Sequence, residues 1–257
     1  MRLLTDGEIE LEGRLVDASN TTLRGFVRLG ELTARCVYKP VRGERPLWDF
    51  PDGTLAGREV AAYLLCEASG WNLVPPTVLR DGPLGEGACQ LWLDEPEDAP
   101  PLVGFVPADN LPPGWLSVAS ARDEAGAAYL LAHADDTGLA RMALFDAVVN
   151  NADRKGGHVL HLGDGRLYGV DHGVCFHVED KLRTVLWGFV GRPLPAPEAQ
   201  VLAGLATELR GALGQRLAEL ISAEEVEAAA ARVDRLLAQG CFPDPVPGWP
   251  AVPWPPI

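Results

Sequence analysis

The sequence predicts an α+β protein with two lobes, and three observations support this. Apolar and polar residues alternate in three short segments near the N-terminus, which is typical of antiparallel strands joined by turns: 8–16, 23–29 and 32–38. Beyond residue 122 the apolar residues follow helical spacing instead. The segment 94–101 between these regions is acidic and rich in proline, so we place an N-terminal lobe at 1–93 and a C-terminal lobe at 94–257.

Composition limits the classes of protein to which this chain can belong. With 257 residues, of which 47% are hydrophobic and 23% charged, the chain can bury a substantial core. A formal net charge of −14 argues against a duplex nucleic-acid partner and against peripheral contact with anionic membranes. The five cysteines are scattered and odd in number, and no apolar run is long enough to cross a membrane. We therefore expect a cytoplasmic protein with reduced cysteines and no membrane span.

The remaining elements follow from caps, turns and prolines. In the N-terminal lobe we expect a helix over 55–69, capped by Thr54 and ended by Gly70, and two strands at 76–80 and 87–93. Residues 102–121 show no clear pattern. The C-terminal lobe is expected to contain five helices: near 123–134, from 136 or 137 to 150, 196–210, 212–221 and 222–240, the last with a capping box of Ser222 and Glu225. The Pro- and Trp-rich tail after residue 240 is expected to pack in extended form on the C-terminal lobe.

The stretch 150–177 holds the strongest candidate for an active site. It begins with the polar loop NNADRKGGH, which follows a helix that is apolar nearly all round and is therefore expected to be buried. Strands at 159–162 and 166–170, joined by Gly-Asp-Gly, predict a hairpin that brings Asp153 and Asp171 near one edge. One carboxylate can accept a proton from an attacking hydroxyl while the other holds a divalent metal on a phosphate chain.

Lysine is rare in this chain, with three residues against nineteen arginines. Lys39 ends the third strand, and Lys155 lies in the polar loop two residues after Asp153. A compact ammonium group at these places can reach phosphate oxygens, although a solvated lysine is an equal alternative. Glu59 lies beside the apolar face of the helix 55–69. It either pairs with Lys39 or stays solvated in the first helical turn.

Five pieces of the sequence occur together in an order that resembles a known family: VYKP around Lys39, REVAAYLL around Glu59, QLWL at 90–93, NNADRKGGH and VDHG. They resemble the phosphatidylinositol 3/4-kinase superfamily, and most closely its type II phosphatidylinositol 4-kinase-like branch with small actinobacterial members. The resemblance extends over about residues 8–240. It implies a two-lobed protein-kinase-like fold: an N-terminal lobe of antiparallel sheet plus helix, and a mainly helical C-terminal lobe with the catalytic hairpin.

The resemblance also implies roles for individual residues around a bound ATP. Lys39 would contact the α- and β-phosphates, Glu59 would orient Lys39, and Asp153 would take the catalytic position. Independently of the resemblance, the place of Lys155 two residues after Asp153 suits contact with the γ-phosphate. The turn that contains Ser19, Asn20 and Thr22 would cover the phosphates. The backbone around Gln90, Leu91 and Trp92 would hold adenine.

The expected metal site departs from the pattern of the branch. Asp171 would bind Mg²⁺ or Mn²⁺, and His158 stands where the branch places an Asn as second metal ligand. Imidazole suits Mn²⁺ better than Mg²⁺. Three outcomes stay open: an altered metal preference, firm binding by Asp171 alone, or weak activity.

The sequence thus predicts an ATP- and metal-dependent kinase that transfers the γ-phosphoryl group to a hydroxyl acceptor, which is a lipid, a protein or a small molecule. A nucleotide-binding pseudokinase is the first alternative, because His158 replaces the expected Asn. A metal-dependent hydrolase is the second, because four histidines lie close to Asp153 and Asp171: residues 158, 161, 172 and 177. However, His158 and His161 are three residues apart on a strand and so point to opposite faces.

Overall fold

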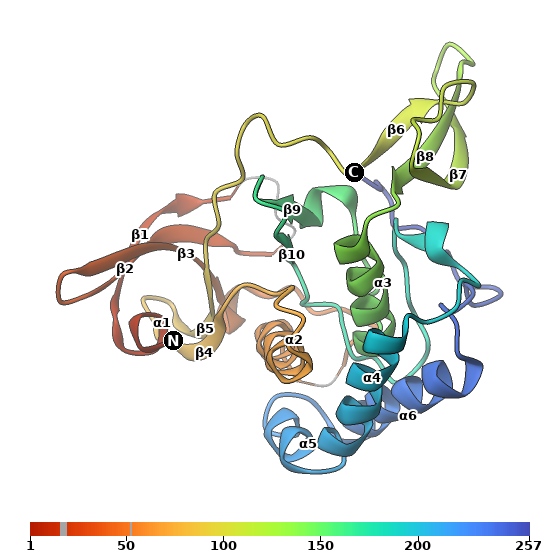
Figure 1. The fold of residues 1–257 in the computed structure, drawn as a ribbon. Helices are drawn as coiled ribbons and strands as arrows, with labels where there is room; N and C mark the ends of the chain where they lie inside the picture. The colour runs from red at the N-terminus through yellow and green to blue at the C-terminus, as the bar shows by residue number, and fades with distance from the viewer. Residues whose placement is uncertain (16–19, 52) are drawn as a thin grey trace.

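The N-terminal lobe is a five-stranded antiparallel sheet with a helix packed against it. The computed structural model describes residues 1–15, 20–51 and 53–257. The sheet has the order β1-β2-β3-β5-β4 (Figure 1). Its elements and the helices beside it are α1 (Arg2–Asp6), β1 (Glu8–Arg14), β2 (Leu23–Leu29), β3 (Leu32–Pro40), α2 (Leu55–Ser69), β4 (Thr77–Gly82) and β5 (Gly85–Leu91). The expected three-stranded meander and the later strand pair are confirmed.

Local sequence signals explain the boundaries of α2. The Thr54 hydroxyl accepts a hydrogen bond from the Gly57 backbone N–H, and Gly70 ends the helix in the left-handed conformation at φ 69°. Glycine reaches this conformation without steric cost. The carboxylate of Glu44 adds a second cap, since its oxygens accept the N–H groups of Leu55 and Ala56. The predicted helix over 55–69 is therefore confirmed at both ends.

The C-terminal lobe consists of helices, a small sheet and a hairpin. Its elements are β6 (Val103–Pro107), β7 (Trp115–Arg122), β8 (Ala128–Ala134), α3 (Thr137–Val149), β9 (Val159–His161), β10 (Leu167–Gly169), α4 (Ala196–Glu208), α5 (Ala212–Leu217) and α6 (Ala223–Gln239). The buried helix α3, the hairpin β9–β10 and the three final helices agree with the sequence-based expectation. The capping box of Ser222 and Glu225 is present at the start of α6.

One predicted element is wrong. The sequence predicts a helix near 123–134 and shows no clear pattern over 102–121, whereas the chain forms an antiparallel sheet there in the order β6-β8-β7. Strand β8 is the central strand of this sheet, and its Leu131, Ala132 and His133 are buried. Hydrogen bonding of β8 to β6 on one edge and to β7 on the other outweighs the weak helical preference of its alanines and leucines. The sheet protrudes from the lobe beside the C-terminus of the chain (Figure 1).

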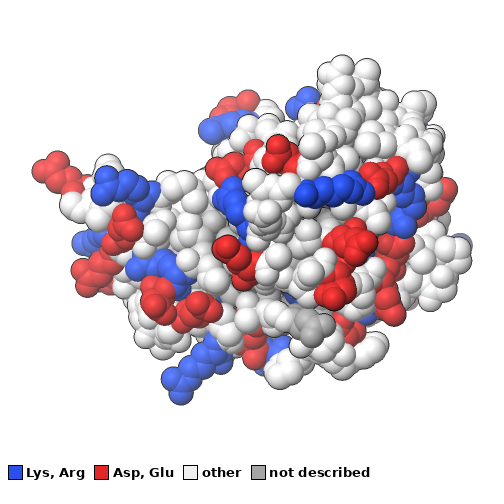
Figure 2. Space-filling view, turned by 90° about the horizontal axis from the view of Figure 1, so that it is seen from below, with Lys and Arg blue, Asp and Glu red and all other residues white. Residues whose placement is uncertain are grey.

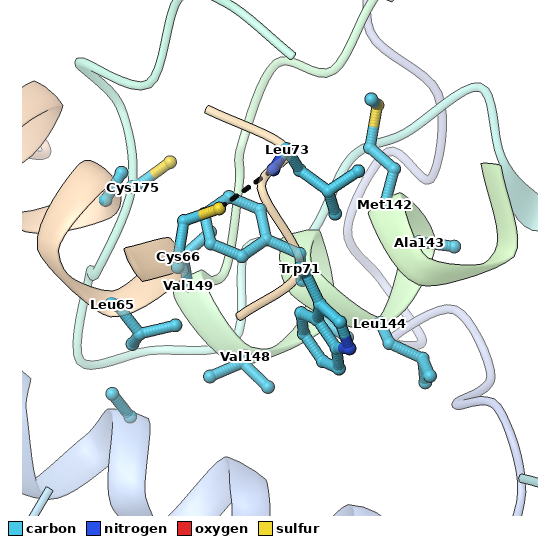
Figure 3. Packing of buried hydrophobic residues seen from close by; sticks show 14 of the residues in the cluster. Leu65, Cys66, Trp71, Leu73, Met142, Ala143, Leu144, Val148, Val149 and Cys175 are labelled. Carbon is cyan, nitrogen blue, oxygen red and sulfur yellow. Dashed lines mark hydrogen bonds between the residues drawn. The ribbon is translucent and has the colours of Figure 1, made fainter. Parts of the chain in front are cut away.

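The largest hydrophobic core joins α2 to the C-terminal lobe. In Figure 3, Leu65 and Cys66 of α2 lie near Val148 and Val149 of α3, and Trp71 lies in the same cluster. The Leu73 backbone N–H donates to the Cys66 Sγ at 3.1 Å. A separate, smaller core lies in the sheet of the N-terminal lobe. Helix α2 is therefore packed as part of the C-terminal core as well as against the sheet.

The tail packs on the C-terminal lobe, as expected, but it contains turns and bends between residues 247 and 255 and is not extended throughout. The carbonyl of Ala251 accepts hydrogen bonds from the Thr184 backbone and the Trp187 indole, and the Pro256 carbonyl accepts one from the Gly156 backbone at 2.8 Å. The tail thus reaches the loop that follows Asp153.

The surface carries charges of both signs. On the face shown in Figure 2, lysine and arginine side chains are interspersed with aspartate and glutamate. Among the described residues, the helices are too short or too polar to cross a membrane.

Candidate active site

A cleft of about 250 Å³ contains most of the residues that the sequence singled out. The N-terminal lobe contributes Lys39 from β3 and Glu59 from α2. The C-terminal lobe contributes the loop between α3 and β9 and the segment that follows β10. The lining residues are Asn20, Thr21, Thr22, Lys39, Pro40, Glu44, Leu47, Leu55, Ala56, Glu59, Asp153, Lys155, His158, Asp171, Gly173 and Val174.

Lys39 joins the two lobes through two carboxylates. Its Nζ contacts Oε1 of Glu59 and lies 3.0 Å from Oδ1 of Asp171. Glu59 is buried, at 2% exposure, whereas the side chain of Asp171 is half exposed. The pairing of Glu59 with Lys39 is thus present, and the alternative of a solvated Glu59 is wrong.

The contacts change the protonation properties of all three groups. The nearby Lys39 ammonium holds the pKa of Asp171 well below its usual range. Burial would lower the pKa of Lys39, but the carboxylates of Asp171 and Glu59 outweigh it and raise that pKa. Burial raises the pKa of Glu59, and Lys39 acts against that rise. An ammonium held between carboxylates is a fixed positive charge, which suits it to contact an anionic ligand.

Asp171 owes its position to an uncommon backbone conformation. Two residues after the end of β10 it adopts φ 63°, in the left-handed region that aspartate tolerates better than most residues. The turn directs its carboxylate to Lys39 on one side and to His158 on the other, where Oδ2 lies 3.5 Å from Nε2.

Asp153 lies between two cations in the same cleft. Its Oδ2 is 3.2 Å from Nζ of Lys155, and its Oδ1 is 3.9 Å from a guanidinium nitrogen of Arg183. Burial raises the pKa of Asp153, and the two cations counteract that rise. A carboxylate with a raised pKa is a better proton acceptor than an exposed one, as a general base requires.

His158 is neutral at physiological pH. Burial lowers its pKa to about 4, because the charged imidazolium would lose its hydration. A neutral imidazole beside a carboxylate can serve as a metal ligand. Asp171 and His158 thus place a carboxylate and a neutral imidazole side by side at the cleft.

Arg154 is the residue of this site whose role the sequence reasoning missed. Its guanidinium donates to both carboxylate oxygens of Asp146 on α3, at 2.8 and 2.9 Å, and both side chains are fully buried. It also donates to the backbone carbonyls of His158 and Val170 and contacts Nε2 of His172. The loop with Asp153 and the end of the hairpin are thus tied to α3 through one side chain.

The expected phosphate-covering turn is only partly described. Ser19 lies outside the described residues. Asn20 and Thr22 line the cleft, and Oδ1 of Asn20 accepts the Arg45 backbone N–H at 2.9 Å. Thr21 lines the cleft as well, although the sequence reasoning did not select it.

The expected adenine contacts lie apart from this cluster. The side chain of Gln90 is buried and donates to Thr77 at 2.8 Å instead of entering the cleft. The backbone N–H groups of Leu91 and Trp92 donate to the carbonyls of Pro76 and Arg35. Those two donors are engaged within the protein, so an adenine in this region would need other partners.

The four clustered histidines do not assemble into one site. His172 is buried beside Arg154, and Nδ1 of His177 accepts the Glu179 backbone N–H at 3.0 Å. His161 lines a different cavity, together with residues between Glu95 and Val103. Across residues 1–15, 20–51 and 53–257, no three His, Cys, Asp or Glu side chains are arranged to hold a metal ion by themselves.

Comparison with known proteins gives one close relative. No model of a known protein family matches the chain. The chain is 52% identical to protein Rv2133c of Mycobacterium tuberculosis over 261 aligned residues, which cover 98% of this chain and 94% of that protein. The chain belongs to the family of protein Rv2133c.

A solved structure identifies the class of that fold. The crystal structure of the Golgi casein kinase aligns with 92% of this chain and 72% of its own chain, with a TM-score of 0.55 and 14% identity. At this identity the likeness concerns the fold alone. The chain thus has a two-lobed, kinase-like α+β fold, as the sequence predicted.

Proposed function

We propose that this protein is an ATP- and metal-dependent phosphotransferase that transfers the γ-phosphoryl group to a hydroxyl acceptor. The observation that carries the proposal is the contact of Lys39 with both Glu59 and Asp171 in a cleft that also contains Asp153 and Lys155. In kinases a lysine paired with a helix glutamate contacts the phosphates, and an aspartate from the opposite lobe holds the metal. The kinase-like fold supports this assignment.

Each residue of the cleft would have a separate role in phosphoryl transfer. Lys39 would contact the inner phosphates, while Lys155 would offset charge on the transferred group. Asp153 would orient the acceptor hydroxyl and accept its proton, and its raised pKa favours that role. Asp171 and His158 would hold Mg²⁺ or Mn²⁺, which supplies charge neutralisation on the phosphates.

The acceptor stays open among lipid, protein and small molecule. The segment 178–192 after Asp171 offers three basic residues for an anionic headgroup, and all three have partners within the protein. Lys181 is buried and 3.2 Å from Asp49, and Arg192 donates to Asp135 at 2.7 Å. Only Arg183 of these three lies near Asp153. The resemblance to the type II phosphatidylinositol 4-kinase-like branch supports a lipid, whereas this scarcity of available cations disfavours one.

A nucleotide-binding pseudokinase is the second candidate, and one observation favours it. The branch pattern places an Asn where His158 stands, and the neutral imidazole lies 3.5 Å from Asp171. A hydrolase with its own zinc site has less support, since the described residues provide no cluster of three ligands.

Binding and transfer of labelled ATP test the proposal. The wild-type protein should bind ATP with Mn²⁺ or Mg²⁺ by calorimetry. It should pass the terminal phosphoryl label to one of three acceptor sets: phosphatidylinositol vesicles, hydroxyl-bearing peptides or small polyols. Asp153→Asn should abolish transfer and retain ATP binding. Asp164→Asn, in the exposed turn of the same hairpin, is the matched control and should change neither.

Each result selects one interpretation. ATP binding without transfer to water or to any acceptor would favour the pseudokinase. Absence of ATP binding under all metal conditions would contradict both nucleotide-dependent functions. Stoichiometric zinc in the purified protein would favour the hydrolase.

A further inference from the structure

The helix that carries Glu59 is attached to the C-terminal lobe by a buried ion pair. A guanidinium nitrogen of Arg58 lies 2.6 Å from Oε1 of Glu225 on α6, and their side chains are 1% and 6% exposed. Another guanidinium nitrogen donates to the Cys175 carbonyl at 2.7 Å, and the Phe50 ring centroid lies 5.0 Å from the guanidinium carbon. One side chain of α2 thus contacts α6, the segment after Asp171 and the loop before α2.

Two further features hold α2 in the same place. A Cβ added at Gly57 would lie 2.7 Å from the backbone oxygen of Leu220, so a glycine is required for this close approach of the two lobes. The middle of α2 contributes to the main core of the C-terminal lobe: Ala61, Ala62, Tyr63, Leu65 and Cys66. Ion pair, backbone approach and apolar packing all attach α2 to the C-terminal lobe.

Arg58 and Glu59 are neighbours in sequence and face different partners. We propose that Arg58 and Glu225 are positioning residues that hold α2 on the C-terminal lobe, so that Glu59 stands against Lys39 before any nucleotide binds. The catalytic meaning of this pairing rests on the proposed function. In kinases the lysine–glutamate pair must be assembled for transfer, and helix placement controls that assembly. Because its anchors are buried, this chain keeps the pair assembled without a separate activating event.

Glu225 allows the anchoring contact to be separated from the local stability of α6. Its Oε2 accepts the Ser222 backbone N–H at 3.0 Å, while Oε1 faces Arg58. Glutamine is accepted at this capping-box position, so Glu225→Gln keeps the cap and removes the charge opposite Arg58. Ser222→Ala does the opposite. It removes the capping hydrogen bond that the Glu225 backbone N–H donates to the Ser222 hydroxyl at 3.2 Å, and it leaves the ion pair in place. The two variants form a matched pair.

The rate at which Lys39 is acetylated reports whether α2 holds Glu59 against it, and this measurement requires neither ATP nor turnover. The chain contains three lysines, so each acetylated position can be assigned by mass spectrometry. At low reagent concentration, Lys39 should be protected by Glu59, and Lys155 serves as the internal reference. Glu225→Gln should raise the Lys39:Lys155 acetylation ratio about fivefold, which corresponds to the loss of about 1 kcal/mol. Glu59→Gln is the positive control and should raise the ratio at least as much.

The outcomes separate anchoring from general loosening. An unchanged ratio in Glu225→Gln, with a raised ratio in Glu59→Gln, would overturn the proposal. So would a rise in Ser222→Ala equal to that in Glu225→Gln. If Glu225→Gln does not fold, the double variant Arg58→Met with Glu225→Gln removes both buried charges and keeps the cap. An unchanged Lys39:Lys155 ratio in this double variant would overturn the proposal in the same way. Since acetylation requires no catalysis, failure of phosphoryl transfer leaves this result interpretable.

Discussion

Replacement of Asp146 by asparagine tests whether the buried pair with Arg154 holds the catalytic loop in place. The asparagine side chain has nearly the same shape as aspartate, but it would leave the Arg154 guanidinium buried without a counter-charge. Both side chains are fully buried, and two of the five hydrogen bonds of the Arg154 guanidinium go to this carboxylate. Loss of one partner from a buried pair costs about 3–5 kcal/mol. We therefore expect Asp146→Asn to lower the free energy of unfolding by about that amount.

The assay is urea unfolding followed by tryptophan fluorescence, with an exposed pair as control. Arg166 and Asp164 approach as closely as the buried pair, at 2.8 Å, but their side chains are 64% and 50% exposed. Asp164→Asn should leave the unfolding midpoint unchanged, because water screens an exposed pair. If Asp146→Asn and Asp164→Asn shift the midpoint equally, burial does not determine the strength of the contact, and the assigned role of Arg154 is refuted.

Three further predictions follow from the cleft and the tail. Lys39→Met should raise the ATP dissociation constant about tenfold or more, because it removes a charge-assisted contact, while thermal melting shows a folded protein; unchanged affinity would contradict the role of Lys39. His158 stays neutral in the folded protein down to a pKa of about 4 but takes a proton near pH 6.5 when unfolded. Protonation of this one imidazole should therefore lower the free energy of unfolding by about 3 kcal/mol as the pH drops through this window. In urea titrations, the fall in stability over the window should be smaller for His158→Asn than for the wild type. The Trp249 ring centroid lies 5.1 Å from Nζ of the buried Lys181, and the Trp249 indole N–H donates to the Lys181 carbonyl. Trp249→Ala should therefore expose Lys181 and raise its acetylation.

The sequence was sufficient where local chemistry determines the structure. Thr54 and Gly70 define both ends of α2, and Asp136 caps α3 by accepting two backbone N–H groups. The Gly-Asp-Gly turn with its flanking strands defines the hairpin. These signals act over a few residues, so they can be read without knowledge of the fold.

The sequence was insufficient where partners are distant along the chain. Strand β8 is stabilised by β6 and β7, and its own composition of alanine and leucine indicated a helix. In the sequence, Arg154 is one of several polar residues of its loop, and its partner Asp146 lies on α3. A signal for it was present: Asp146 is a lone carboxylate in a helix that is apolar nearly all round, and such a group requires a buried cation. Arg154 lies eight residues after Asp146, in the loop that follows the helix, and is therefore a candidate for that cation.

The charge of the cleft makes a final prediction about metal dependence. Two lysines face four carboxylates among the lining residues: Lys39 and Lys155 against Glu44, Glu59, Asp153 and Asp171. A nucleotide triphosphate adds several negative charges, which the lysines alone cannot offset. ATP should therefore bind only with a divalent cation and show no binding in excess EDTA.

Asp171→Asn should make ATP binding less dependent on a divalent cation. Removal of this carboxylate lowers the repulsion of the phosphates and also removes a metal ligand. Calorimetry should then show stronger ATP binding than wild type in EDTA, and a smaller gain when Mn²⁺ is added. Asp164→Asn, outside the cleft, should behave as wild type in both conditions. If Asp171→Asn instead keeps the full gain with Mn²⁺, the metal is held elsewhere, and the pairing of Asp171 with Lys39 is structural rather than catalytic.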